Sequence, residues 1–543
     1  MQEQQLLKNT FILTMATFIS KFLGFVYVIP FTHLVGTQGF ALYMYAYRPY
    51  TIMLSIATAG LPLAVSKFVS KYNELGDYRV GHRLFRSSIF YMAFSGIATF
   101  LIMYNLSPLL ADHLVGDSKS GNTKEDVVLV MKCVSLALLV VPFLSISRGF
   151  FQGYKIMQPT AVSQVIEQIV RVVWILAGTF VVIKLLDKSI AIASGVATAG
   201  ALVGSLAGLV VMMYFWKVKN NEINLMKINS HVNHQISTFG MYKELLSYAI
   251  PFVIVGLAIP LYQLIDTFSL NKIFLTNGHS MVQAETLNSV LGLTQTLVLI
   301  PVSLATALSL SIIPSVTALY TARNFRMLRN QVTQSFQMLL FIILPIVIGM
   351  SILSEPAYVT FFGIENSFKV GSHILRYYSP VAILFAFFTV TAAILQGINK
   401  QKFAIISLMI GLVLKMLLNK PLVMAFDEIG PIIATSIGYG ASIAINFMVI
   451  HKILRYNFSV ILKRFFFFLA MSTIMGLTVF ILNKEMSYTN FDLRIKSLLE
   501  LVVNGILGAY VYLLLSQKMG VTQVILKKDV KLFNTIFFDK KAS

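Results

Sequence analysis

Long apolar runs recur along almost the whole chain of 543 residues, and they constrain its fold more than any other feature. The sequence is 57% hydrophobic and only 12% charged, with a mean hydropathy of +0.77. A soluble core cannot hide that much apolar surface, so the surplus must face lipid. Because a bilayer core needs roughly 20 apolar residues per helix, we expect an all-α polytopic membrane protein with 14 transmembrane helices. These predicted spans are 10–32, 41–68, 84–108, 127–152, 159–185, 190–216, 245–271, 285–318, 332–354, 372–397, 402–425, 431–452, 464–483 and 495–516.

The distribution of basic residues predicts the orientation. The net charge is +21, and with the N-terminus inside, the inner segments hold about three times as many Lys and Arg as the outer ones. We therefore expect both termini in the cytoplasm and a multi-pass protein of the bacterial plasma membrane. This distribution also explains the basic excess without nucleic acid, which we do not expect as a partner.

A weak internal repeat suggests two halves. The pair Gln152-Gly153 recurs 244 residues later as Gln396-Gly397, and the same offset carries Arg171 onto Lys415. Two six-span halves in one orientation predict two lobes related by a pseudo-twofold axis along the membrane normal, with the substrate path between them.

The predicted domains follow from the repeat. They are an N-lobe (1–216), a cytoplasmic linker (217–244), a C-lobe (245–452), an appended helix pair (453–516) and a basic cytoplasmic tail (517–543). Within the tail, the sequence from Val521 to Phe538 suits either an amphipathic helix on the anionic inner leaflet or a disordered basic segment.

Charged residues inside predicted spans are the candidate functional residues, because such charges usually face a polar interior and mark a pathway. They are Lys21, Arg48, Glu167, Arg171, Asp266 and Lys415, with Arg148 at the inner mouth. Cations outnumber acids, so a net positive cavity is predicted. Such a cavity favours an anionic cargo, because Arg offers phosphate a bidentate fork and Lys offers it a point charge.

Several of these residues have a purely structural alternative. Glu167 and Arg171 have the i, i+4 spacing of a helix ion pair. Asp266 is a candidate for ion coupling or for neutralising a neighbour, and Lys415 could snorkel toward an interface. Lys21 and Arg48 have no acid in their own spans, which favours a role in substrate binding.

Enzyme motifs and metal-site spacings are missing from the sequence. It has no phosphate-binding Gly-x-x-x-x-Gly-Lys-Ser/Thr loop, and the single cysteine, Cys133, rules out an internal disulfide. The histidines lie in or near predicted loops or span ends without metal-ligand spacing. We therefore expect a transporter with no catalytic residues, metal or cofactor, with coupling to the membrane potential or to a monovalent cation left open.

Four stretches resemble a known family. They are Ser20 to Phe25, Arg48-Pro49, Gly60-Leu61-Pro62 and Arg148 to Tyr154. Together with the 12 plus 2 span count, they resemble the polysaccharide-transport branch of the multidrug/oligosaccharidyl-lipid/polysaccharide flippase superfamily, and within it the MurJ/YtgP-type lipid II flippases.

The resemblance implies a central cationic cavity that binds the pyrophosphate of an undecaprenyl-linked peptidoglycan precursor. It also implies a groove in spans 13 and 14 for the lipid tail. The essential first-span arginine of the family falls at Lys21, which keeps the charge and loses the fork, and its second-span arginine falls at Arg48.

We therefore expect a lipid II flippase that works by alternating access, with Lys21, Arg48, Arg148, Arg171 and Lys415 binding the pyrophosphate. Its expected partners are the lipid-linked glycan, membrane lipids and the cell-wall synthesis machinery. Three alternatives remain: a flippase for teichoic acid, O-antigen or a spore-cortex glycan, a cation-coupled multidrug exporter, and a non-transporting scaffold.

Overall fold

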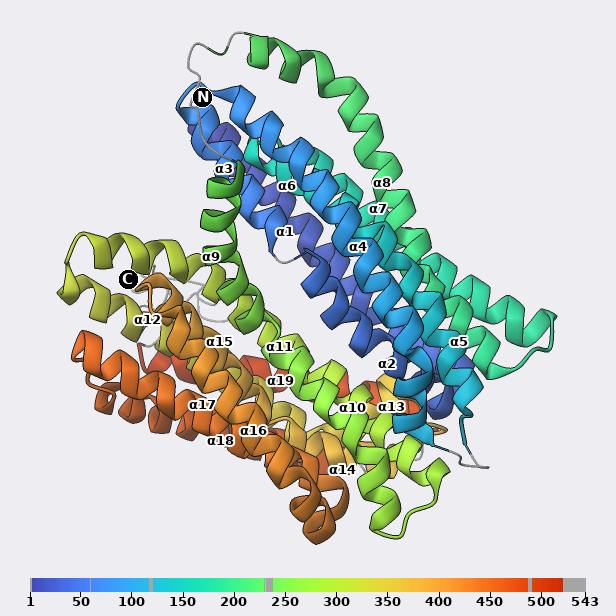
Figure 1. The fold of residues 1–543 in the computed structure, drawn as a ribbon. Coiled ribbons are helices and arrows are strands. Elements are labelled where there is room, and N and C mark those ends of the chain that lie inside the picture. The colour runs from blue at the N-terminus through green and yellow to red at the C-terminus, as the bar shows by residue number, and fades with distance from the viewer. Residues whose placement is uncertain are drawn as a thin grey trace, which may run out of the picture. The chain divides into compact units, whose positions relative to one another are not determined.

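The computed structural model describes residues 2–58, 60–116, 121–228, 230, 238–486 and 491–520, which fold into helices joined by short turns (Figure 1). By packing, the chain divides into two compact units. The first contains Met1–Gly292 and Leu412–Ala434, and the second contains Leu293–Gly411 and Thr435–Ser543.

The helices of the first unit follow one another with short breaks. They are α1 (Gln2–Val26), α2 (Val28–Thr58), α3 (Leu61–Glu74), α4 (Tyr78–Val115), α5 (Lys124–Ser135), η1 (Leu136–Leu139), α6 (Val141–Gly153), α7 (Gln158–Phe180), η2 (Val181–Leu185), α8 (Ile190–Ile228), α9 (Thr238–Gly256) and α10 (Ala258–Thr276). Three helices cross the boundary between the units, namely α11 (Met281–Thr321), α16 (Gln401–Phe426) and α17 (Gly430–Leu454), and η3 (Asp427–Ile429) lies between the last two.

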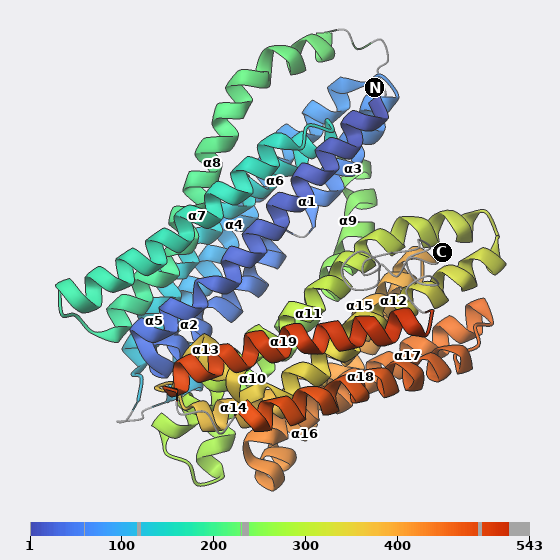
Figure 2. The same cartoon turned by 180° about the vertical axis from the view of Figure 1, so that it is seen from behind.

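The second unit holds the remaining helices. They are α12 (Phe325–Ile352), α13 (Ser354–Phe362), α14 (Phe368–Tyr378), α15 (Val381–Gly397), α18 (Ser459–Met486) and α19 (Leu493–Lys518). Within this unit α12 packs against α18, and α18 and α19 lie side by side (Figure 2). Buried polar groups pair with one another there: the Asn446 side chain accepts a hydrogen bond from Ser407 Oγ at 2.7 Å and donates one to Thr391 Oγ1 at 3.0 Å.

Two glycines set the chain direction early in the first unit. Gly36 lies inside α2 with φ 67° and ψ −172°, a conformation that breaks the helix and that residues with a Cβ rarely adopt. Gly60 has φ 70° and precedes α3, whose second residue is Pro62. A Cβ on Gly60 would lie 2.9 Å from the Val253 side chain of α9, so this turn also allows α9 to approach closely.

Large apolar side chains on the helix surfaces are exposed, as the hydropathy predicts for a chain that faces lipid. Phe90 and Phe94 on α4 are 74% and 75% exposed. Ten helical stretches of the described chain are long and apolar enough to cross a membrane, or up to twelve if each of two bent helix pairs counts as one span. The protein is therefore an all-helical, multi-pass membrane protein, and the predicted count of 14 spans is not reached by this criterion.

The boundaries of the two units differ from those of the predicted lobes. The first unit takes in α9 and α10, because α9 packs on α3, and α10 packs on α2 and α4. The predicted linker begins inside α8, which continues to Ile228. Residues 231–237 of that linker and residues 521–543 of the predicted tail lie outside the described residues. The division into N- and C-lobes stays a prediction.

Candidate functional site

A charged pocket of about 370 Å³ lies in the first unit, where α1 packs against α7. On α7, Gln164, Glu167, Gln168 and Arg171 have i, i+3, i+4 and i+7 spacing and therefore share one face. The residues that line the pocket are Ser20, Lys21, Gly24, Tyr27, Tyr47, Arg148, Gln164, Glu167, Gln168 and Arg171.

Close contacts hold α1 against α7 at this pocket. Ser20 Oγ donates to the Gln164 carbonyl at 3.3 Å. At Gly24 a Cβ would lie 3.2 Å from Gln168 Nε2, so a small residue here lets the amide side chain approach α1. These contacts bring the Lys21 face of α1 toward the charged face of α7.

One carboxylate in the pocket serves two guanidinium groups. Glu167 Oε1 accepts from Arg171 Nη2 at 2.6 Å, and Glu167 Oε2 contacts Arg148 Nη2 at 2.8 Å. Arg148 also donates to Ser163 Oγ from Nη2 at 2.8 Å. The i, i+4 pair predicted from the sequence is thus present, and Arg148 joins it from α6. Two partly buried cations share a single negative charge.

Two groups in the pocket are available to bind an anion. Lys21 is exposed, and in the described chain its ammonium makes no ion pair or hydrogen bond. Arg171 Nε is buried without a hydrogen-bond partner among the described residues, although a buried N–H group is costly to leave unpaired. With three cations and one acid, the pocket favours a negatively charged ligand.

Arg48 and Lys415 do not line this pocket and lie instead against α10. The Arg48 guanidinium donates from Nη1 to Thr267 Oγ1 at 2.5 Å and to the Gln263 carbonyl at 3.2 Å. Lys415 is fully buried, and its Nζ lies 2.7 Å from Asp266 Oδ1. Asp266 therefore neutralises a neighbouring lysine. The alternative that the Lys415 side chain extends to a membrane interface is wrong, because the side chain is fully buried.

The structure thus brings three of the five predicted cations together and places two elsewhere. Sequence reasoning missed the aromatic and amide part of the pocket. Tyr47 stacks on Tyr43 at a centroid distance of 5.2 Å, and the Tyr27 and Tyr43 hydroxyls lie 2.9 Å apart. The i, i+4, i+7 spacing of Tyr43, Tyr47 and Tyr50 on α2 was the signal for this aromatic face.

Glycines on α8 allow α7 to sit where its charged face meets the pocket. A Cβ on Gly204 would lie 2.8 Å from the Glu167 carbonyl oxygen and 2.9 Å from Arg171 Cβ, and Gly208 accepts a hydrogen bond from Ser163 through its carbonyl. Small residues at such spacings let membrane helices approach closely.

We expect Gly204→Val to push α7 away from α8, to lower stability by about 1–3 kcal/mol through overpacking and to impair transport. The measurement is the melting temperature of the purified protein together with complementation. Gly195→Ala on the same helix is the control, because the nearest atom to its Cβ would be 3.6 Å away. If the valine variant melts and functions like the control, the α7–α8 contact does not position the pocket.

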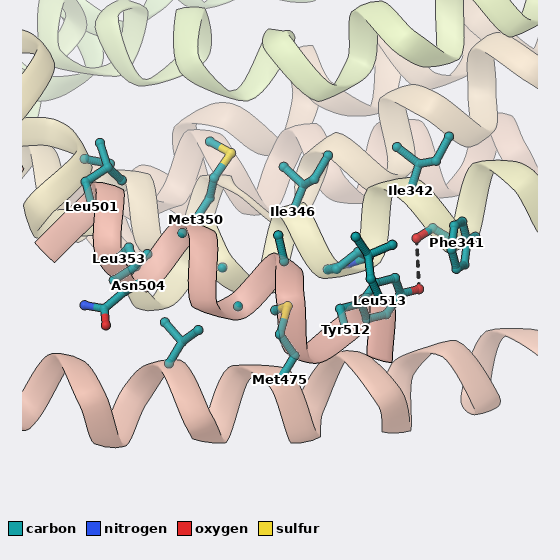
Figure 3. A pocket seen from close by; sticks show the side chains of 17 residues that line it. Phe341, Ile342, Ile346, Met350, Leu353, Met475, Leu501, Asn504, Tyr512 and Leu513 are labelled. Carbon is teal, nitrogen blue, oxygen red and sulfur yellow. Dashed lines mark hydrogen bonds between the residues drawn. The ribbon is translucent and has the colours of Figure 1, made fainter. Parts of the chain in front are cut away.

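A second, apolar pocket of about 400 Å³ lies in the second unit between α12, α18 and α19. Figure 3 shows Ile346 and Met350 on one side of it and Met475 on another, with Tyr512 donating a hydrogen bond to the Phe341 carbonyl at 2.9 Å. No atom lies within 4 Å of the Cβ position of Gly505 on α19, whereas a Cβ on Gly508 would lie 2.8 Å from the Val479 side chain of α18. The lining is almost wholly apolar, so this pocket suits a hydrocarbon chain.

No group of three metal-ligating side chains is present in the described ranges. Two of the histidines in the sequence, His231 and His234, lie outside those ranges. His279 lies on the turn before α11, where its ring Nε2 contacts Asp427 at 2.8 Å.

Comparison with known proteins gives consistent matches. Residues 6–320 match the family described as polysaccharide biosynthesis protein, and residues 251–420 match the MatE family. The lipid II flippase MurJ of Bacillus subtilis (strain 168) is 44% identical over 528 residues, which cover 96% of this chain and 97% of that protein. Stage V sporulation protein B of the same organism is 22% identical over 417 residues, 76% of this chain and 77% of that protein.

Among solved structures, one of the lipid II flippase MurJ in an inward closed conformation has the same fold. Its TM-score is 0.67 at 18% identity, and the alignment covers 95% of this chain and 100% of that chain.

Proposed function

The chain belongs to the MurJ family of flippases, which are transporters within the multidrug/oligosaccharidyl-lipid/polysaccharide superfamily, and from this premise we propose that it moves lipid II from the inner to the outer leaflet of the plasma membrane. Lipid II is the undecaprenyl-pyrophosphate-linked peptidoglycan precursor. The observation that carries the proposal is the pocket in which Lys21, Arg148 and Arg171 face a single acid, Glu167.

In this proposal the pyrophosphate binds first to Lys21, whose ammonium is exposed in the pocket. Arg171 then supplies its unpartnered Nε–H, and Arg148 contributes positive charge while Glu167 keeps both guanidinium groups in place. Charge-assisted hydrogen bonds to phosphate are about twice as strong as neutral ones. The amide groups of Gln164 and Gln168 add donors suited to the sugar hydroxyls next to the pyrophosphate.

Arg48 and Lys415 have a different role in this proposal. Arg48 contacts Thr267 and Lys415 pairs with Asp266, both on α10. Arg48 adds positive charge near the substrate path, whereas Lys415 adds no net charge and holds α16 against α10. Because Asp266 forms an ion pair with the Lys415 ammonium, we propose that Asp266 neutralises this charge and does not couple transport to an ion. The inside-negative potential then favours outward movement of the anionic headgroup, by about 2.3 kcal/mol per charge and 100 mV.

We also propose 14 spans with both termini in the cytoplasm. The stretch Met15–Thr58 has 44 residues and Gln401–Leu454 has 54, each about twice the length of one crossing. The first is broken at Gly36 and the second at η3. Counting two crossings in each stretch, and one in each bent pair, gives the predicted number and two six-span lobes that alternate in access.

The apolar pocket of the second unit is proposed to hold part of the undecaprenyl tail. We expect Gly505→Phe to fill it and to lower transport several-fold, because the added ring competes with the lipid for the same space. Gly505→Ala is the matched control, since no atom lies within 4 Å of its Cβ position. The measurement is the rate of lipid II movement in liposomes. Equal rates for both variants would show that the lipid tail does not bind in this pocket.

The test of the function is depletion of the protein in its own cell. Lipid II should accumulate on the inner leaflet and cell-wall synthesis should stop. The match to a sporulation protein favours one alternative, a flippase for another lipid-linked glycan, and normal lipid II distribution with accumulation of that glycan would support it instead. The MatE match raises a multidrug exporter, for which the positive pocket is unsuited, and altered drug sensitivity with normal lipid II would support that.

A further inference from the structure

A second cationic pocket lies in the first unit, between the start of α4 and the end of α8. It has a volume of about 360 Å³ and shares no residue with the pocket between α1 and α7. Its cations are Arg79, Arg83 and Arg86 of α4 and Lys227 of α8, and none of the described residues that line it is a carboxylate. Four positive groups around one cavity favour a ligand with concentrated negative charge.

The geometry of α4 aligns these cations. Residues 79, 83 and 86 have i, i+4 and i+7 spacing, so they lie on one face of the first three turns of the helix. All three arginines are exposed, while Lys227 is half-buried. Lys227 comes from the last turn of α8, where that helix curves away from α7 (Figures 1 and 2). The site therefore joins the start of α4 to the end of α8.

His82 and Ser87, which line the pocket, contact aromatic side chains of neighbouring helices. The His82 ring lies 6.2 Å from the Trp216 ring and 5.7 Å from the Phe150 ring. Ser87 Oγ is 3.0 Å from the Tyr242 hydroxyl of α9. These contacts pack the start of α4 against α6, α8 and α9.

The same face of α4 becomes apolar just beyond the arginines. Phe90, Phe94, Ile97 and Leu101 continue the stripe at spacings of four, four, three and four residues after Arg86, and they are 74%, 75%, 51% and 49% exposed. At 1.5 Å per residue, Arg86 to Leu101 spans about 22 Å. The apolar stripe is thus long enough to follow an acyl chain through one leaflet of a core about 30 Å thick.

We propose that this face of α4, with Lys227 of α8, binds an anionic phospholipid of the inner leaflet. The phosphate lies among Arg79, Arg83, Arg86 and Lys227, and the acyl chains lie along Phe90, Phe94, Ile97 and Leu101. The charge and the apolar stripe are both needed for this assignment, because a free phosphate compound would use only the first. The site is independent of the proposed transport of lipid II, and its place in the inner leaflet rests on the proposed cytoplasmic position of the N-terminus.

The test is retention of phosphatidylglycerol by the purified full-length protein, measured by native mass spectrometry with phosphatidylcholine as the zwitterionic comparison. The wild type should retain phosphatidylglycerol preferentially. The triple variant Arg79→Gln/Arg83→Gln/Arg86→Gln should bind it at least about tenfold more weakly, since each cation near an anionic lipid surface is worth roughly a fivefold change. A matched control removes Arg323, Arg326 and Arg329, which are exposed and lie in the second unit.

A second pair of measurements separates a lipid from a soluble phosphate. Phe90→Ser/Phe94→Ser should weaken phosphatidylglycerol binding several-fold, and glycerol phosphate at the same concentration should not displace the lipid. Equal retention of the two lipids by the wild type, or equal loss in the triple variant and its control, would overturn the proposal. If glycerol phosphate displaces the lipid and the serine variants have no effect, the pocket binds a soluble anion, and the proposal of a phospholipid site is overturned.

Discussion

Replacing Lys21 by Gln is expected to abolish transport while leaving the amount and the melting temperature of the protein unchanged. The side chain is exposed in the charged pocket and has no ion pair or hydrogen bond within the described chain, so its loss breaks no packing contact. It removes a positive charge where an anionic headgroup is proposed to bind. The measurement is complementation in a strain depleted of its own lipid II flippase, with the protein level in membranes as the check on folding.

Two matched variants accompany this prediction. Lys21→Arg keeps the charge and should retain transport, because a guanidinium also donates to phosphate. Lys188→Gln removes an exposed lysine that does not line the pocket, and it should complement fully. Growth supported by Lys21→Gln as well as by Lys188→Gln would show that the pocket charge is dispensable.

Replacing Lys415 by Met is expected to have the largest effect on stability. Asp266 is 2% exposed, and among the described residues its buried negative charge would keep only the Asn419 amide, at 3.2 Å, as a hydrogen-bond partner. Breaking one partner of a buried ion pair typically costs about 3–5 kcal/mol. The melting temperature and the yield of folded protein should both fall sharply.

The double variant Asp266→Asn/Lys415→Met should recover most of the lost stability, because it removes both charges at once and leaves an amide for Asn419 to contact. The measurement is a double-mutant cycle of melting temperatures. If the double variant is no more stable than Lys415→Met alone, the loss of stability does not come from leaving the Asp266 charge unpaired.

The fold class follows from the sequence because apolar runs of membrane length leave few alternatives. The helix ends follow less well, since the break in α2 depends on the positive φ of Gly36, and glycines also occur inside unbroken helices such as α8. Length and hydropathy give fewer spans than the 14 predicted. The reason is that two long stretches, Met15–Thr58 and Gln401–Leu454, are each counted once although each contains an internal break.

The charged residues of the site could be found from their depth in apolar runs, and their partners only in part. Glu167 and Arg171 lie one turn apart, so their ion pair was predictable. Arg148 reaches the same carboxylate from another helix, and Asp266 meets Lys415 across 149 positions of the chain. Such contacts depend on how helices pack, which no local spacing encodes.

The tyrosines of the pocket were missed for a different reason. Tyr27 and Tyr47 carry no charge, and the chain has 23 tyrosines. Only the packing of α1, α2 and α7 distinguishes these two from those that face lipid or fill the core.

We propose that the cationic pocket of the first unit binds the pyrophosphate of lipid II and that the protein carries this lipid across the membrane. The most direct test is reconstitution of the purified protein in liposomes that contain labelled lipid II, with the fraction accessible to an external reagent followed over time. We predict rapid exposure of the inner-leaflet pool with the wild type and Lys21→Arg, and a rate near that of protein-free liposomes with Lys21→Gln. Equal rates for the wild type and Lys21→Gln would show that the pocket charge does not bind the headgroup, and no movement with the wild type would show that the protein does not transport lipid II.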